Sequence, residues 1–111
     1  MKRYCFTLDL VNDPLLIEQY DTWHKKDRIW PEIPAGIRAS GVSSMQIYRL
    51  GTRLCMVMET SDTFDLLQKS REDAVNPRVQ EWEQLMWQYQ QALPGSQAGE
   101  KWVQMERVFE L

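Results

Sequence analysis

The chain has 111 residues and a formal net charge of -3, with 43% hydrophobic and 11% aromatic residues. This length fits one domain over residues 1–111, and this composition excludes an intrinsically disordered chain. The acidic balance argues against a nucleic-acid partner, because a basic face is what releases counterions from phosphates. No apolar run approaches the ~20 residues of a transmembrane helix, so we expect no membrane partner.

The cysteines and the N-terminus bear on the compartment. Cys5 and Cys55 lie in apolar runs without a CxxC spacing. This indicates buried reduced thiols, although a disulfide between neighbouring strands stays open and needs an oxidising compartment. The first residues are charged, and the chain is charged again at Asp9, unlike a secretory signal. We therefore expect a cytoplasmic protein.

The first half of the chain contains one strand and two helical stretches. Residues 3–10 alternate between apolar and polar side chains, which predicts a half-buried strand. Asn12-Asp13-Pro14 is typical of a helix start, with Asn or Asp as the cap and Pro in the first turn. Two prolines, Pro31 and Pro34, interrupt the helical spacing. A second helical stretch then covers about residues 32–40 and ends at Gly41.

The second half begins with a hairpin and ends with a strand. Gly51-Thr52 separates residues 42–50 from residues 53–59, which predicts two antiparallel strands. The later segments are a helix opened by a Ser or Asp cap, its restart at Asn76-Pro77, a loop over residues 93–100 and a last strand over residues 101–109.

The order strand, helix, strand, strand, helix, strand predicts a ferredoxin-like α+β fold. Its antiparallel sheet carries two helices on one face. Residues 54–58 are apolar on both faces of their strand. Because the helices cover only one face, the other must meet a ligand or a second subunit. We therefore expect a homodimer that packs sheet against sheet.

Tyr20 and His24 are candidate functional residues, because a spacing of four puts a phenol and an imidazole on one helix face. Histidine is suited to proton transfer near neutral pH. The alternative is a surface or capping histidine near a helix end. A single histidine cannot complete a zinc set, and there is no Gly-rich phosphate loop or dinucleotide-binding unit, so no cofactor is expected.

Three further aromatic residues suit a sugar, because rings stack on its C–H face: Trp30, Tyr48 and Trp82. Any of them can instead fill a core or an interface. Tyr48 shares a strand face with Ser44 and Gln46, which is either a pocket floor or a solvated surface.

Tyr20-x-x-x-His24 followed by "IWPE" resembles the signature of the L-rhamnose mutarotase family. The resemblance extends over nearly the whole chain, through "KRYCF", "IYRL", "NPRVQEWEQLMWQYQ" and "EKWVQMERVFEL". The N-terminal, second-helix and C-terminal segments are similar to a branch associated with L-fucose catabolism.

This resemblance implies a ferredoxin-like fold that forms a dimeric α/β-barrel. It implies a monosaccharide substrate and interconversion of the α and β anomers of a 6-deoxy-L-hexose, without cofactor or metal. His24 matches the proton donor, and Tyr20, Tyr48 and Trp82 match sugar-contacting positions. We expect Trp30 to complete the stacking wall.

The chain departs from the family form at two places. The gap from His24 to Trp30, "KKDRI", is longer, which allows the histidine to be shifted against Trp30. The second helix has Trp82-Glu83 where members often carry Trp-Trp. We interpret Glu83 as a substrate-binding carboxylate that reads a hydroxyl pattern different from that of rhamnose.

Two other functions remain open. One is a dimeric ferredoxin-like monooxygenase, whose sites also use His and Trp in an apolar pocket. The other is a non-enzymatic small-ligand binding module, in which the aromatic cluster is only core. The pattern alone favours the module, and the family resemblance favours the mutarotase.

Overall fold

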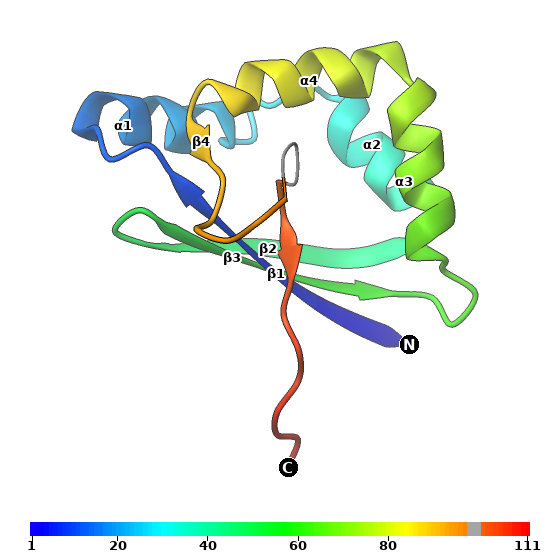
Figure 1. The fold of residues 1–111 in the computed structure, drawn as a ribbon. Coiled ribbons are helices and arrows are strands. Elements are labelled where there is room, and N and C mark those ends of the chain that lie inside the picture. Colours follow the sequence, from blue (N-terminus) through cyan, green and yellow to red (C-terminus); the bar gives the residue numbers. More distant parts are fainter. Residues whose placement is uncertain (98–100) are drawn as a thin grey trace.

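The computed structural model describes residues 1–97 and 101–111, which form an antiparallel sheet with four helices on one face (Figure 1). The elements in chain order are β1 (Lys2–Leu10), α1 (Pro14–Trp23), α2 (Glu32–Ala39), β2 (Val42–Leu50), β3 (Arg53–Thr60), α3 (Leu66–Val75), α4 (Pro77–Trp87), β4 (Gln90–Gln91) and β5 (Val103–Gln104). Within the described ranges, no helix has the length and apolar run needed to cross a membrane.

Strand β1 lies in the middle of the sheet. The strand order is β2-β3-β1-β4, and β5 also pairs with β1, on antiparallel register throughout. The predicted ferredoxin-like α+β fold is confirmed. Each of the two helices in the predicted order consists of two shorter helices. The turn that contains Pro31 separates α1 from α2, and Asn76 separates α3 from α4.

Side-chain caps explain where the helices begin. The Asp13 carboxylate accepts from the backbone N–H groups of Leu15 and Leu16, and Pro14 occupies the first turn, where no N–H is needed. Asn76 caps α4 in the same way, with Pro77 behind it. These two predicted starts are confirmed, and they fix where α1 and α4 lie over the sheet.

Alternation along β1 builds the core between sheet and helices. Phe6, Leu8 and Leu10 are buried on the helix side. Leu10 joins a cluster around Tyr20, Trp82 and Met86 from the helices, and Phe6 joins a second cluster toward the other end of the sheet. Trp102, which follows the loop after β4, packs against both clusters.

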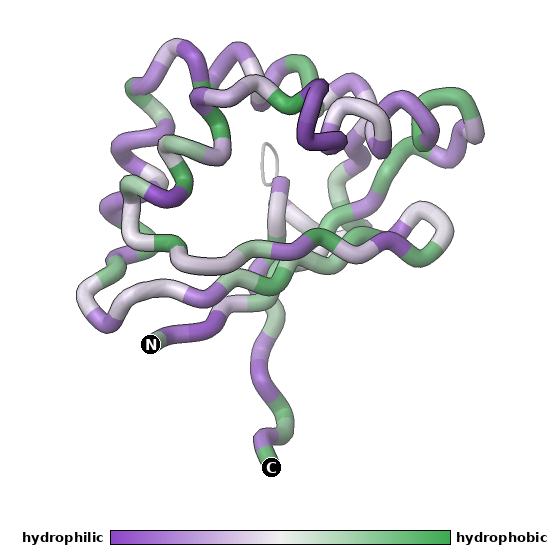
Figure 2. Tube along the Cα trace, turned by 180° about the vertical axis from the view of Figure 1, so that it is seen from behind, coloured by the Kyte–Doolittle hydropathy of each residue, from purple (hydrophilic) through white to green (hydrophobic). Residues whose placement is uncertain are grey.

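The predicted last strand over residues 101–109 is wrong in its extent. The strand ends at Gln104, and after one more backbone bond, from Met105 N–H to the Cys5 carbonyl, the tail runs away from the body (Figure 1). The tail carries hydrophobic segments in Figure 2, and Val108 and Phe109 are 92% and 76% exposed. Alternating apolar residues indicate that one face of a segment is to be buried, but they do not identify what covers that face. Part of the predicted loop, residues 98–100, lies outside the described residues.

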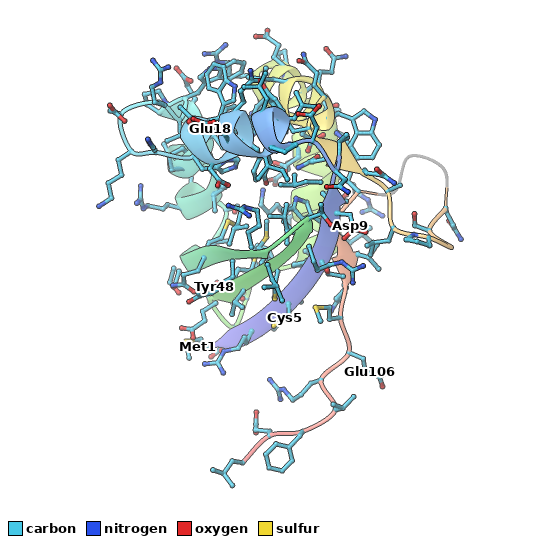
Figure 3. The ribbon with its side chains drawn as sticks, turned by 90° about the vertical axis from the view of Figure 1, so that its left-hand side faces the viewer. Met1, Cys5, Asp9, Glu18, Tyr48 and Glu106 are labelled. Carbon is cyan, nitrogen blue, oxygen red and sulfur yellow. The ribbon has the colours of Figure 1, made fainter. Side chains whose placement is uncertain are left out.

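The sheet face opposite the helices carries Cys5, Cys55 and Val57, all half-buried, and Tyr48, which is 61% exposed (Figure 3). Both cysteines are free thiols. The prediction of a second subunit on this face stays a prediction.

Gly41→Ala is expected to lower the free energy of unfolding by about 1–3 kcal/mol. Gly41 follows α2 with φ of +104°, and an added Cβ would lie 3.1 Å from Ser61 Oγ. The matched control is Gly36→Ala inside α2, where an added Cβ meets nothing within 4 Å. That control is expected to raise stability by about 0.5–1 kcal/mol. Urea unfolding of both variants checks this, and equal effects of the two would contradict it.

Candidate active site

A cavity of about 720 Å³ lies between the helices and the sheet. Its floor includes four apolar side chains from β2 and β3: Met45, Ile47, Met56 and Met58. Its walls come from the end of α1 and from α2, α3 and α4. This size and this mainly apolar lining are typical of sites for small molecules.

His24 caps the C-terminal end of α1 and lines the cavity. Its backbone N–H donates to the Asp21 carbonyl, and its Nδ1 lies 2.8 Å from the Tyr20 carbonyl oxygen. Because a carbonyl oxygen only accepts, Nδ1 carries the hydrogen and donates it. In the neutral ring, Nε2 then has the free lone pair and is the nitrogen left for a ligand.

Tyr20 lies directly against this imidazole, with 4.3 Å between the two ring centroids. Its side chain is buried, which raises the pKa of the phenol to about 12, against the opposing effect of a hydrogen bond with the Gln90 side chain. The hydroxyl therefore stays protonated near neutral pH. The sequence prediction that Tyr20 and His24 share a helix face is confirmed.

Burial also acts on His24. It lowers the pKa of the imidazole below the ordinary value of 6.5, against the opposing effects of the bond to the Tyr20 carbonyl and of the Asp21 charge. Desolvation disfavours the charged form, so the ring is neutral near neutral pH. A neutral imidazole with Nε2 unprotonated is a general base.

Trp82, which lines the cavity, and Trp30, which contacts it, form an aromatic wall. The Trp82 ring is buried and meets His24 and Trp30 nearly edge to face, at centroid distances of 5.8 Å and 5.3 Å. The longer gap between His24 and Trp30 forms an exposed turn over residues 25–28. The structure therefore brings His24 and Trp30 to the same tryptophan despite that gap.

Glu83, the next residue along α4, also lines the cavity. Its carboxylate accepts from the Gln80 amide at 3.3 Å, and its Oε2 lies 3.6 Å from the Lys101 ammonium. The structure thus gathers four of the six predicted site residues on the cavity wall: Tyr20, His24, Trp82 and Glu83. Trp30 stands behind Trp82.

Tyr48 does not join this group. It lies on the sheet face away from the helices, where Cys55 is its partner on β3 (Figure 3). Its neighbour Ile47, and Met45 on the same side as Ile47, face the cavity instead. Successive side chains of a strand point to opposite faces, so in this chain Tyr48 is separated from His24 by the sheet itself.

Several polar residues of the cavity wall were missed by the sequence reasoning, and Gln90 and Arg78 are the two with contacts to predicted site residues. Gln90 is 8% exposed and bonds to Tyr20. Arg78 lies four residues before Trp82 on α4. This spacing puts both side chains on one helix face, so the sequence contained a signal that Arg78 lies near the site. Across residues 1–97 and 101–111, no three histidine, cysteine or acidic side chains are grouped so as to hold a metal ion.

The model of a family described as L-rhamnose mutarotase matches residues 3–111 of the chain. The L-fucose mutarotase of Xanthomonas campestris pv. campestris is 45% identical over 111 residues, 100% of this chain and 89% of that protein. The chain belongs to the L-rhamnose mutarotase family. A Dictyostelium discoideum protein whose name states no activity is 37% identical, over 99% of this chain and 90% of that protein. The expectation of a carbohydrate isomerase is confirmed at the level of the family.

Two solved structures share the fold. The L-rhamnose mutarotase of Formosa agariphila has a TM-score of 0.74 at 22% identity, over 100% of this chain and 99% of that chain. Tetracenomycin F2 cyclase of Streptomyces glaucescens has a TM-score of 0.68 at 19% identity, over 100% of this chain and 97% of that chain. One architecture thus carries different chemistry, and the residues of the site must decide the function.

The titration of His24 is expected to have its midpoint below 6.5, because burial lowers its pKa. The signals of the chain's single imidazole, followed by NMR, check this and should show the Nδ1-protonated tautomer. As the pH falls through 6.5, the unfolded chain takes up a proton before the folded one, so stability falls until the folded pKa is passed. His24→Gln should remove this part of the pH dependence of unfolding. A midpoint at or above 6.5 would contradict the prediction.

Proposed function

We propose that the protein interconverts the α and β anomers of a 6-deoxy-L-hexose. The single observation that carries the proposal is the imidazole of His24 on the cavity wall, whose Nδ1 is held by the Tyr20 carbonyl and whose Nε2 is left for a ligand. Family membership supports the same reaction. L-fucose is the proposed substrate, because the 45% identical relative is named as an L-fucose mutarotase.

Ring opening needs a proton removed from the anomeric hydroxyl and a proton delivered to the ring oxygen. Both oxygens are bonded to C1, so one nitrogen serves both. His24 Nε2 takes the hydroxyl proton as the C1–O5 bond breaks, and the imidazolium then gives its proton to O5. Rotation about C1–C2 and the reverse steps close the ring on the other face. Such acid–base help contributes about 10²–10⁴-fold in rate.

The rest of the cavity suits a deoxy sugar. Trp82, with Trp30 behind it, offers an aromatic wall to the C–H face of the ring. The methionines of the floor, Met45, Met56 and Met58, offer an adaptable apolar surface to the 6-methyl group. Glu83 and Lys101 supply charged hydrogen-bond partners for hydroxyl groups of the sugar.

The catalytic role of His24 is tested by anomeric saturation-transfer NMR on L-fucose, L-rhamnose and D-glucose. His24→Gln is expected to lose about 10²–10⁴-fold of the catalysed exchange. Tyr20→Phe should lose less, because the backbone carbonyl that orients His24 remains. Glu18→Gln, on the exposed side of α1 (Figure 3), is the matched control and should keep full exchange. A folded His24 variant with undiminished exchange would refute the role, and no exchange by the unaltered protein would refute the function.

We also propose that the active form is a cytoplasmic homodimer. The outer sheet face is half apolar, and the tail after Met105 exposes Val108 and Phe109. A second copy packed on this face would bury the apolar side chains of the face and of the tail. Tyr48 would then lie in the dimer interface. Free thiols at Cys5 and Cys55 suit a reducing compartment.

Light scattering coupled to size-exclusion chromatography should give twice the chain mass of 13.2 kDa. Phe109→Ser is expected to shift the equilibrium toward the single chain, because it removes apolar area that only a partner would bury. Glu110→Gln, next to it in the tail, should leave the mass unchanged. A single-chain mass for the unaltered protein at high concentration would rule the dimer out.

A further inference from the structure

The guanidinium of Arg78 lies over the ring of Trp30. Arg78 stands in the first turn of α4, and its Cζ is 3.7 Å from the Trp30 ring centroid. Trp30 precedes α2 and is half-buried. This distance is well within the ~6 Å at which a cation is attracted to an aromatic face. The contact therefore joins α4 to the turn before α2, which is far from it in the sequence.

Two carboxylates hold the guanidinium in this position. Arg78 Nε lies 3.2 Å from Glu32 Oε2, and Nη1 lies 3.1 Å from Glu81 Oε2. Glu32 belongs to α2 and lines the cavity, whereas Glu81 stays on the exposed side of α4. A planar guanidinium makes two such bonds and still offers its face to a ring, which a lysine ammonium cannot do.

The other side of Trp30 meets the site. Its ring is 5.3 Å from that of Trp82, and Trp82 is 5.8 Å from the imidazole of His24. The contacts thus run without a gap from Arg78, through Trp30 and Trp82, to the catalytic ring. Trp30 lies in the turn before α2 rather than within a helix, so its orientation depends on these side-chain contacts.

We propose that Arg78 is a positioning residue, which holds Trp30 against Trp82 as the outer layer of the sugar-stacking wall. Together with Glu32, it also forms the part of the cavity rim between α2 and α4. This proposal rests on the proposed function, since the wall it describes is the one that binds the sugar. A stacking wall contacts the sugar in the ground state and in the transition state alike, so its loss raises KM and spares kcat.

Arg78→Met removes the positive charge and the N–H donors of the guanidinium but keeps much of the length of the side chain. It is expected to raise KM for L-fucose about three- to tenfold, the range of one cation–π contact, with kcat changed less than about twofold. Arg78→Lys should recover only part of this loss. Arg71→Met is the matched control, because it removes an exposed arginine of α3 that is not among the residues lining the cavity, and it should leave KM unchanged.

A double-mutant cycle separates positioning from a general loss of stability. In a Trp30→Ala background, Arg78→Met should raise KM no further, because Arg78 acts through that ring. Additive effects of the two substitutions, or an unchanged KM in Arg78→Met alone, would overturn the proposal.

A spectroscopic readout tests the contact without any activity. With 5-fluorotryptophan incorporated and signals assigned by Trp→Phe variants, Arg78→Met should shift the Trp30 fluorine signal and leave that of Trp87 in place. An unmoved Trp30 signal would overturn the proposal even in an active enzyme. A moved signal in a protein without sugar exchange would instead leave Arg78 as the holder of Trp30 and reject the proposed function.

Discussion

The hydrogen bond from His24 Nδ1 to the Tyr20 carbonyl is the constraint on which the site depends. It spans one helical turn at the C-terminal end of α1, where the backbone N–H of the cap residue His24 donates to the Asp21 carbonyl instead of to that of Tyr20. One bond thus completes the helix end, fixes the tautomer and leaves Nε2 free of this contact on a residue that lines the cavity.

The aromatic cluster then sets the electrostatics of that imidazole. Tyr20 and Trp82 contact the ring and keep water away, which lowers the pKa of His24 and raises that of Tyr20. Both shifts keep the uncharged forms. A neutral base and a protonated phenol side by side suit a reaction in which protons move between two oxygens of a neutral sugar. Tyr20 and Trp82 thus serve the proposed acid–base role of His24 as well as packing.

Local signals carried most of what was predictable. Asp13-Pro14 and Asn76-Pro77 mark helix starts by backbone chemistry that operates within four residues, and the spacing from Tyr20 to His24 defines a helix face. The expected contact of Tyr48 with the sugar stays a prediction, because the family resemblance gives its identity but not its strand face, and in this chain it is not among the residues lining the cavity. The extent of the last strand depends on whether a surface covers the tail, and the contact of Arg78 with Trp30 joins distant segments. No local pattern contains either.

The placement of Glu83 shows how the C-terminal segment enters the site. Successive helix residues are turned by about 100°, so Glu83 stands beside Trp82 rather than stacked with it. Lys101 approaches from the segment before β5, 3.6 Å from that carboxylate, and its ammonium also lies 5.2 Å from the ring centroid of Trp87. A tryptophan at position 83 would leave this ammonium without its carboxylate partner. The Glu83–Lys101 ion pair thus holds the carboxylate, so the proposed contact of Glu83 with the sugar also depends on Lys101.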